Sequence, residues 1–466
     1  MTPQLAVEAP VRARRAAPPR RTPRRAKQTG HTVVAVVGLG YVGLPTAIAL
    51  RGAGCRIVGI DVSGSRLSAI RDGEAELLPS EQRDLAGYLA EDGFVLTNRL
   101  KALDAADLVL ICVPTPVDEQ LRPDLQILRG ACAEVVCHAR PGQTLVLTST
   151  TYVGTTRELL ADPLAERGLE IGEDVFVAFA PERIDPGVTE HAQLKTPRVL
   201  GGVTPECTKR AAEVLRHTCK HLHLVSSPEA AELVKLYENT FRAVNIALAF
   251  EIAEACGVHG LDPVEVTEGA ATKPYGFLAH YPSAGVGGHC IAVDPYYLLH
   301  DLREQGRPAK MAEEALRRVS GRPRHIAWRA HETLVELGRP LPDARVLIVG
   351  ASYKPGVADT REAPALQIMQ RLRSEGARVE YHDPLVPSLD LKGQELYSVS
   401  IGESPRAPRR KRAAAGAGAT RTPEDYDLTI LATLHPDHDY DWLARCPAVL
   451  DCTYRRPDAG VQRFLP

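Results

Sequence analysis

The sequence has 466 residues, 44% of them hydrophobic and 24% charged, and its net charge is -2. This length and balance are typical of a chain with about three globular domains and exclude a wholly disordered protein. Residues 1–29 hold eight Arg or Lys against Glu8 alone, which leaves -9 for the rest of the chain and argues against nucleic acid as the main partner.

The first segment, residues 1–29, is rich in Pro and Arg and lacks the apolar core of a signal peptide. Such a segment cannot bury a hydrophobic core, so we expect a disordered basic tail. An Arg-rich leader with few acids is also typical of an organelle transit peptide, and the sequence leaves this alternative open.

A dinucleotide-binding fold is expected next. The strand-like run 33–37 leads into residues 38–43 (Gly-Leu-Gly-Tyr-Val-Gly), then a helix-like run to Leu50 and a strand, 56–60, that ends at Asp61. Strand, GxGxxG, helix, strand and acid together form the Rossmann fingerprint. The glycines allow the pyrophosphate to approach the helix N-terminus, and Asp61 can bond both ribose hydroxyls. Because its carboxylate would repel a 2′-phosphate, the sequence predicts NAD rather than NADP.

Three further predicted strands end in polar or proline-rich segments. The run 108–113 leads into Pro-Thr-Pro at 114–116, 144–147 leads into Thr-Ser-Thr-Thr at 148–151, and 175–180 leads into Pro-Glu-Arg at 181–183. Ligands of open α/β sheets bind beyond the carboxyl ends of the strands, so we expect these segments to line one crevice. Glu182 is a candidate general base, with an ordinary surface acid as the alternative.

A long helix is predicted from Ser227 to about Gly257, with a capping Ser, a Pro at the first position and a Gly at the end. Because its middle is apolar nearly all round, we expect it to be buried between domains. Lys235 and Asn239 share one face of it. A buried Lys indicates a functional role, and a Lys that reaches solvent from the helix edge is the alternative.

A glycine-rich loop at 284–295 contains Cys290 and, four residues later, Asp294. A cysteine on such a loop is typical of a nucleophile, because glycine lets a ligand approach closely. The alternative is a buried structural thiol in a tight turn.

The C-terminal part continues with a polar helical stretch to about Glu336 and then a second α/β unit. Strands are predicted at 345–350, 378–381, 428–431 and 449–451 and a helix at 363–375, and residues 402–422 indicate a disordered insertion. This unit lacks GxGxxG, so we expect it to hold a different nucleotide. The predicted fold is α/β, with two Rossmann-like parallel-sheet domains joined by a long central helix. The expected domain bounds are 30–218, 219–325 and 326–466.

The ten cysteines show no CxxC pair or Cys/His ligand spacing, so we expect no zinc site and a reducing, cytoplasmic location. No apolar run approaches membrane-spanning length, so we expect no membrane partner.

Taken together, these motifs resemble the UDP-glucose/GDP-mannose dehydrogenase family from about His31 to Arg455. The residues that carry the resemblance are 38–45, 113–116, 149–150 with 154–156, 181–183, 232–239, the Cys290 loop and 359–362. The resemblance implies NAD-dependent, four-electron oxidation of the C6 alcohol of a nucleotide sugar to a carboxylate, for polysaccharide biosynthesis. It also implies a homodimer through the central helix or a higher oligomer.

The resemblance further implies roles for individual residues. Cys290 is the nucleophile and Asp294 its partner, Lys235 and Asn239 stabilise the oxyanion, and Glu182 and Thr150 handle the hydrolytic water. The implied cofactor contacts are Gly38, Gly40, Tyr41, Val42, Gly43, Asp61, Arg66, Pro114, Thr115, Ser149 and Arg361. The implied substrate contacts are Arg183, Lys235, Asn239, Tyr281, Gly287, His289, Lys354 and Arg455.

Within the family, His289 and the run 292–295 (Ala-Val-Asp-Pro) resemble the UDP-N-acetylhexosamine branch, which acts on UDP-GlcNAc or UDP-ManNAc. Thr148, Val153 and the run 319–323 depart from the pattern of that branch. The alternatives are a UDP-glucose 6-dehydrogenase and a two-electron, NAD-dependent sugar dehydrogenase in which Cys290 is structural. A short-chain epimerase is excluded because no Tyr has a Lys four residues after it.

Overall fold

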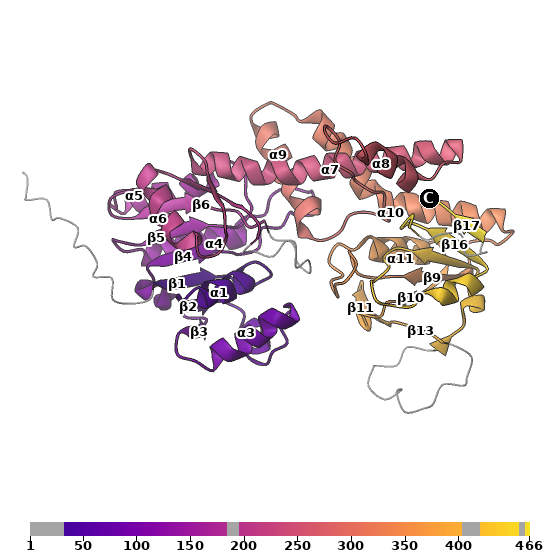
Figure 1. The fold of residues 1–466 in the computed structure, drawn as a ribbon, viewed down its shortest axis with the longest axis horizontal. Helices are drawn as coiled ribbons and strands as arrows, with labels where there is room; N and C mark the ends of the chain where they lie inside the picture. The colour runs from indigo at the N-terminus through magenta and orange to yellow at the C-terminus, as the bar shows by residue number, and fades with distance from the viewer. Residues whose placement is uncertain (1–31, 184–194, 403–419, 456–461) are drawn as a thin grey trace, which may run out of the picture. The chain divides into compact units, whose positions relative to one another are not determined.

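The computed structural model of the protein describes residues 32–183, 195–402, 420–455 and 462–466, without the side chains of residues 289, 290, 462 and 463. The predicted basic tail and most of the predicted insertion lie outside these ranges. Two sheets and a group of long helices make up the described fold (Figure 1).

The first sheet has eight strands in the order β3-β2-β1-β4-β5-β6-β7-β8. All neighbouring strands are parallel except β6 and β7, which are antiparallel. The strands are β1 Val33–Val37, β2 Arg56–Ile60, β3 Phe94–Thr97, β4 Leu108–Ile111, β5 Thr144–Leu147, β6 Phe176–Phe179, β7 Arg198–Gly202 and β8 Leu222–Leu224. The predicted strands are present, whereas β3, β7 and β8 were not predicted.

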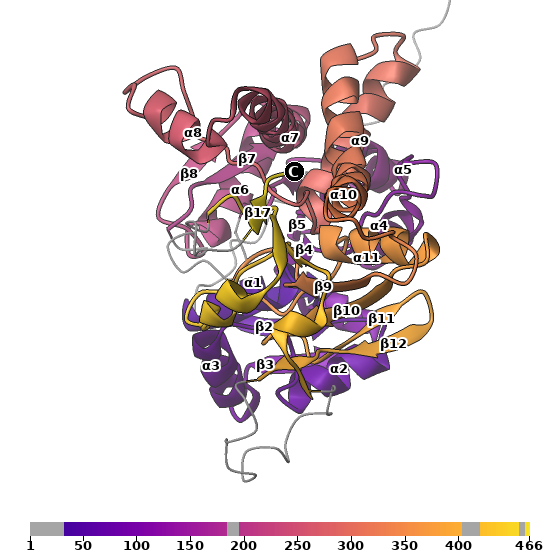
Figure 2. The same cartoon turned by 90° about the vertical axis from the view of Figure 1, so that its right-hand side faces the viewer.

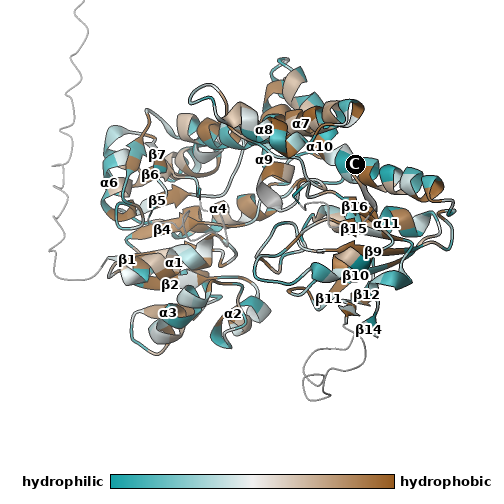
Figure 3. Cartoon of the chain, turned by 45° about the vertical axis from the view of Figure 1, so that its right-hand side comes forward, coloured by the Kyte–Doolittle hydropathy of each residue, from teal (hydrophilic) through white to brown (hydrophobic). Residues whose placement is uncertain are grey.

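Helices cover both faces of this sheet. Ala35 and Val37 of β1 belong to one hydrophobic core, and Val34 and Val36 belong to another, as alternation along a strand buried on both sides requires. The helical segments of this part are α1 Gly43–Gly52, α2 Gly64–Arg71, α3 Pro79–Leu89, η1 Leu100–Ala105, α4 Gln126–His138, η2 Arg157–Ala161, α5 Asp162–Glu166 and α6 Pro205–Leu215. The strands β4, β5 and β6 are the hydrophobic centre of the sheet (Figure 3).

The predicted long helix is α7, Pro228–His259. Ser227 caps its N-terminus, since the Ser227 side chain accepts a hydrogen bond from the Ala230 N–H. The helix ends at Gly260, in the left-handed conformation (φ 65°), three residues later than the predicted Gly257.

The expectation that the apolar middle of this helix is buried between domains is wrong for one of its faces. Leu233, Tyr237, Phe241, Leu248 and Ile252 are exposed, and Tyr237 keeps 66% of its surface. Their spacing of four, four, seven and four residues places them in one stripe along the helix. An all-round apolar pattern predicts burial without saying what covers each face, and within this chain one face of α7 is uncovered.

The opposite side of α7 packs on α9, His289–Glu304, and α10, Lys310–Glu336. The shorter α8, Pro263–Ala271, follows α7 directly, and the two helices lie together in Figure 2. Among the described residues, no helix combines the length and hydrophobicity that crossing a membrane would require.

The second sheet has five parallel strands in the order β10-β9-β15-β16-β17. They are β9 Arg345–Val349, β10 Arg378–His382, β15 Leu428–Leu431, β16 Ala448–Asp451 and β17 Gln462–Phe464, with α11 at Pro364–Ser374, η5 at Pro423–Asp425 and η6 at Asp441–Arg445. Two small additions are the hairpin of β11 Ser388–Leu391 with β12 Gln394–Tyr397, and the pair of β13 Ser400–Ile401 with β14 Thr420–Arg421. The predicted strands and helix of the second α/β unit are present, whereas β17, the hairpin and the pair of β13 with β14 were not predicted.

The predicted disordered insertion at 402–422 is too wide. The Gly402 N–H donates to the Arg421 carbonyl at 3.2 Å, and Thr422 caps η5. The residues at both ends of the predicted insertion are therefore part of the fold. Gly402 extends the pairing of β13 with β14, and Thr422 is the N-cap of η5.

Candidate active site

Four of the predicted catalytic residues meet at one buried place. Lys235 and Asn239 lie one turn apart on α7, Asp294 lies on α9, and Thr150 follows β5. The Asp294 Oδ2 accepts hydrogen bonds from the Asn239 Nδ2 and, at 3.4 Å, from the Thr150 Oγ1. The Lys235 Nζ donates to the Glu182 carbonyl oxygen at 3.1 Å. Segments distant in the sequence thus bring an ammonium, an amide, a hydroxyl and a carboxylate together.

Burial sets the electrostatics of this cluster. Asp294 is 5% exposed and Lys235 is 9% exposed. Loss of solvation raises the pKa of the Asp294 carboxyl to about 6, against the charge of Lys235 and the hydrogen bonds from Asn239 and Thr150, which lower it. The predicted burial of Lys235 is confirmed, and the alternative of a Lys that reaches solvent from the helix edge is wrong.

Cys290 lies in the first turn of α9, one turn before Asp294, and not in an extended loop. The side chains of Cys290 and His289 are outside the described part of the structure. The N-terminus of a helix favours a thiolate, so this backbone position suits a nucleophilic cysteine.

The glycines before Cys290 allow close contact with the second α/β unit. A Cβ at Gly287 would lie 2.6 Å from the Tyr353 Cβ and 2.8 Å from the Glu362 carbonyl oxygen. The Gly288 N–H donates to the Arg361 carbonyl at 3.0 Å. A side chain at residue 287 is therefore excluded by packing.

Glu182 and Arg183 follow β6 on the side of the cluster. Glu182 is buried, and its Oε2 lies 3.6 Å from the Nη1 of Arg198, which is also buried. Arg198 also donates to the Ala180 carbonyl at 3.2 Å. The Arg183 guanidinium forms an ion pair with Glu238 of α7. Glu182 is thus no ordinary surface acid, since a buried arginine lies beside its carboxylate.

The predicted dinucleotide loop has the geometry of a cradle. A Cβ on Gly43 would lie 1.8 Å from the Gly38 carbonyl oxygen, whereas a Cβ on Gly40 would have no atom within 4 Å. The loop is therefore tight on its inner side and open at Gly40, where a pyrophosphate would approach. The Asp61 carboxylate accepts hydrogen bonds from the Leu39 and Ser63 N–H groups, both at 2.9 Å.

Neighbours of this loop include two predicted cofactor residues. The Arg361 guanidinium lies 3.9 Å from the ring centroid of Tyr41 and forms an ion pair with Asp359. The Arg66 side chain donates to the Leu39 carbonyl at 3.0 Å and pairs with Glu76. Both cations thus contact residues of the loop or its flank.

The ends of β4 and β5 are joined as predicted. The Ser149 Oγ donates to the Val113 carbonyl at 2.8 Å, which connects the segment after β5 to that after β4. Pro116 follows Pro114 and Thr115 in the sequence, and its carbonyl accepts a hydrogen bond from the Tyr297 hydroxyl of α9 at 3.0 Å.

The remaining predicted substrate residues form separate pairs. The Arg455 guanidinium lies 5.1 Å from the ring centroid of Tyr281, and the Lys354 Nζ lies 5.8 Å from that of Tyr353. Each of these two contacts places a cation beside an aromatic ring.

Several buried residues near these sites were not predicted. Arg198 and Tyr297 gave no local signal in the sequence. Glu232 accepts hydrogen bonds from residues 154 and 156, and its position one turn before Lys235 could have indicated a shared face. In the second unit, the buried His435 Nε2 lies 3.1 Å from the Asp383 Oδ2, and the His435 Nδ1 accepts from the Gly356 N–H at 3.0 Å.

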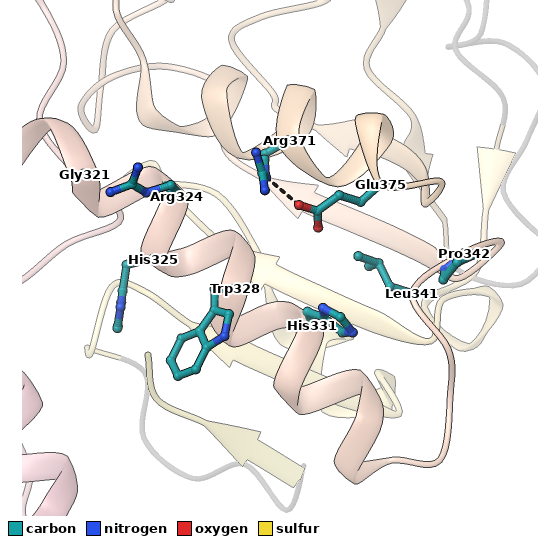
Figure 4. Close-up of a pocket in the computed structure, with 9 residues that line it drawn as sticks. All are labelled: Gly321, Arg324, His325, Trp328, His331, Leu341, Pro342, Arg371 and Glu375. Carbon is teal, nitrogen blue, oxygen red and sulfur yellow. Dashed lines mark ion pairs between the residues drawn. The ribbon is translucent and has the colours of Figure 1, made fainter.

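A cavity of about 680 Å³ lies elsewhere, between α10 and α11 (Figure 4). Its lining includes Arg324, Trp328, His331 and Arg371, and it contains none of the predicted site residues. The described residues contain no group of three or more His, Cys, Asp or Glu that could hold a metal ion.

Comparison with known families gives three consecutive matches. Residues 32–219 match the NAD binding domain of the UDP-glucose/GDP-mannose dehydrogenase family, 229–318 match its central domain, and 347–454 match its UDP binding domain. The first match covers the glycine loop, the second covers α7 and Cys290, and the third covers Lys354.

Similar proteins carry related names. The chain is 35% identical to the UDP-N-acetyl-D-mannosamine dehydrogenase of Pyrococcus horikoshii over 355 residues, which are 76% of this chain and 84% of that protein. It is 33% identical to the UDP-N-acetyl-D-glucosamine 6-dehydrogenase of Pseudomonas aeruginosa, over 77% of this chain and 84% of that protein. The solved structure of the Pyrococcus horikoshii UDP-D-ManNAc dehydrogenase aligns with a TM-score of 0.80 and 30% identity, over 93% of this chain and 99% of that one.

Proposed function

Because the chain belongs to the UDP-glucose/GDP-mannose dehydrogenase family and is an NAD-dependent nucleotide-sugar dehydrogenase, we propose that its substrate is a UDP-N-acetylhexosamine, UDP-GlcNAc or UDP-ManNAc. The reaction is oxidation of the C6 alcohol to the uronate. The observation that carries this proposal is the buried cluster of Lys235, Asn239, Asp294 and Thr150, which includes a residue one turn after Cys290. The N-acetylhexosamine specificity is supported by His289 and by the names of the similar proteins.

The open side of the loop at Gly40 fits the pyrophosphate of NAD, with Asp61 at the ribose. We assign Tyr41, Val42, Arg66, Pro114, Thr115, Ser149 and Arg361 to the same site. NAD, when bound, accepts a hydride from the sugar carbon in each of the two oxidations. The residues of this chain position the sugar carbon, its oxygen and the thiol relative to one another.

Two oxidations at one carbon require a covalent stage. The first yields an aldehyde, and addition of the Cys290 thiolate to it gives a thiohemiacetal that can be oxidised to a thioester. The ammonium of Lys235 and the amide of Asn239 stabilise the negative charge on the oxygen of the adduct. The buried Asp294 orients Asn239 and Thr150 through its Oδ2.

The thioester must then react with water. Glu182 and Thr150 are assigned to that water, with Glu182 as the general base. The Nη1 of the buried Arg198 lies 3.6 Å from the Glu182 Oε2 and limits where this carboxylate can sit. Water attack releases the uronate and returns the cysteine.

Substrate contacts are assigned to residues of all three proposed domains. Arg183, Tyr281, Gly287 and His289 lie in the first 325 residues, and Lys354 and Arg455 lie in the UDP-binding unit. The domain bounds 30–218, 219–325 and 326–466 remain our proposal.

A second copy of the chain is proposed as the cover for α7. The exposed stripe of Leu233, Tyr237, Phe241, Leu248 and Ile252 is a large apolar surface on a helix whose other side packs on α9 and α10. We therefore assign a homodimer through this helix, or a higher oligomer built from it, and assign no nucleic-acid or membrane partner. A cytoplasmic location is supported by the nine cysteines whose side chains are described, all of which are free thiols.

The experiment that tests the function is the number of NADH formed per sugar consumed, over a panel of UDP-GlcNAc, UDP-ManNAc and UDP-glucose. We expect two NADH per UDP-N-acetylhexosamine in the wild type and a loss of several orders of magnitude in Cys290→Ser. Cys137→Ser, which changes an exposed cysteine, is the matched control and should keep full activity.

Two other results would replace the proposal. A higher kcat/KM for UDP-glucose than for both N-acetylated sugars would indicate a UDP-glucose 6-dehydrogenase. One NADH per sugar, with an active Cys290→Ser variant, would indicate a two-electron dehydrogenase with a structural Cys290.

A further inference from the structure

Glu232 lies on the same face of α7 as the two residues assigned to the oxyanion, three positions before Lys235 and seven before Asn239. It is fully buried. No role has been assigned to it so far, although a buried carboxylate is costly to maintain without strong partners.

The hydrogen-bond donors to the Glu232 carboxylate come from the segment after β5. The Gly154 N–H donates to Oε2 at 2.6 Å, and the Thr156 N–H and Oγ1 donate to Oε1 at 2.8 and 2.6 Å. Both carboxylate oxygens are therefore used, and each binds a backbone N–H. Burial raises the pKa of the Glu232 carboxyl to about 7, whereas these hydrogen bonds lower it by favouring the carboxylate.

The segment that Glu232 binds begins with Thr150. Within it, the Thr151 hydroxyl donates to the Thr155 hydroxyl at 2.7 Å, and the Thr155 hydroxyl donates to the Tyr152 carbonyl at 2.8 Å. These bonds make residues 150–156 one compact turn. Glu232 holds one end of the turn against α7, and the bond from Thr150 to Asp294 holds the other.

We propose that Glu232 is a positioning residue that fixes the Thr150 turn against the helix carrying Lys235 and Asn239. The inference rests on the proposed function for the role of Thr150 and deepens it. A carboxylate suits this task because it accepts from two backbone N–H groups at once, whereas a glutamine would present an NH₂ group to one of them.

The first test is Glu232→Gln, assayed for kcat and KM with UDP-GlcNAc and UDP-ManNAc. We expect kcat to fall by about 10- to 100-fold with little change in KM, because a misplaced turn costs the chemical steps more than binding. Glu229→Gln is the matched control. Glu229 lies one turn earlier on α7 and binds the same part of the chain, but through a partly exposed ion pair with Arg157. Its loss should change kcat less than about twofold.

A double-mutant cycle then asks whether Glu232 acts through Thr150. If it does, the variant with both Glu232→Gln and Thr150→Val should be no slower than the slower single variant. Losses that multiply would show that Glu232 acts independently of Thr150, and the proposal would be wrong.

Hydrogen exchange gives a readout that does not depend on turnover. At least one of the amides of residues 154 and 156 should lose protection in Glu232→Gln, and both should keep it in Glu229→Gln. If both amides stay protected in Glu232→Gln, the attachment is not made by Glu232. If protection is lost while kcat is unchanged, the attachment exists without a role in positioning. If the wild type oxidises no UDP-sugar, the proposed function is wrong. The exchange rates of the two amides still show whether Glu232 attaches the turn to α7.

Should Glu232→Gln not fold, Thr156→Val replaces it. This variant removes only the hydroxyl donor and keeps the shape of the side chain. We expect a smaller loss of kcat in the same direction, and an unchanged kcat would overturn the proposal.

Discussion

The side-chain amide of Asn239 donates a hydrogen bond to the Oδ2 of Asp294, 55 residues further along the chain. The same oxygen accepts from Thr150, so one buried atom joins α7, α9 and the segment after β5. Burying this carboxylate costs free energy, because its charge loses the solvation that water provides.

Replacing Asp294 should therefore separate stability from activity. The pKa of this carboxyl is raised by burial from 3.8 to about 6, so its contribution to stability is present at low pH and is lost as pH rises from about 4 to about 6. We expect Asp294→Asn to be more stable than the wild type at pH 8 by roughly 1–3 kcal/mol and to have little activity.

The measurement is urea unfolding at pH 4.5 and pH 8 for the wild type, Asp294→Asn and Asp301→Asn. Asp301 also lies on α9 but takes no part in the cluster, so Asp301→Asn is the control. A less stable Asp294→Asn at pH 8 would contradict the assigned electrostatics.

Lys235 is the cation expected to matter most for the rate. Lys235→Met keeps a long apolar side chain and removes the charge, so it should lower kcat by on the order of 10²–10³-fold. Lys235→Arg should not restore it, because a planar guanidinium does not fit the space of a buried ammonium. Lys209→Met, which removes an exposed ammonium, is the control. Wild-type kcat in Lys235→Met would remove Lys235 from the mechanism.

Asp61 should decide the choice of cofactor. In Asp61→Ala the repulsion of a 2′-phosphate is gone, and the preference for NAD over NADP, measured as the ratio of kcat/KM values, should fall by about tenfold or more. The wild type should prefer NAD. Comparable efficiency with both cofactors in the wild type would contradict the role given to this carboxylate.

Tyr237 is the most exposed member of the α7 stripe and the place to test the dimer. Tyr237→Glu should shift the protein to monomers in sedimentation velocity, because a charge at the centre of an apolar interface is strongly unfavourable. Tyr397→Glu, at an exposed tyrosine of β12, should leave the assembly unchanged. If the wild type is monomeric, a second copy of the chain does not cover the stripe and the proposed dimer is wrong.

Gly287 is fixed by packing. Gly287→Ala would place a methyl group 2.6 Å from the Tyr353 Cβ, so we expect a lower melting temperature and a large loss of kcat/KM. Gly257→Ala is the matched control, since nothing lies within 4 Å of its Cβ position in α7. That variant should be neutral or slightly more stable, because alanine favours helix.

Local patterns predicted much of this molecule. The glycine loop, Asp61 and the Ser227 cap depend on neighbours in the sequence, and each lies where the pattern indicates. The strands of both sheets were visible as apolar runs for the same reason. The grouping of Thr150, Asn239 and Asp294 came from the family resemblance, and the contacts between these three residues support it.

Contacts across long sequence distances were not predictable in the same way. Arg198 beside Glu182 and Glu232 beside the turn at 154–156 depend on how three segments meet. The burial of α7 was misjudged for a related reason: hydrophobicity indicates that a face needs cover, and only the fold shows whether the same chain supplies it.

Arg361 contacts both the glycine segment before Cys290 and the dinucleotide loop. Its carbonyl binds the Gly288 N–H beside Cys290, while its guanidinium lies over Tyr41 of the dinucleotide loop. Tyr353 fills the space left by Gly287 in the same region. Residues 284–288 and 353–363 must therefore be transferred together when parts of this protein are exchanged with those of a relative. A chimera that takes its UDP-binding unit from a relative with another sugar preference must take both stretches together, or it will separate the thiol from its hydride acceptor.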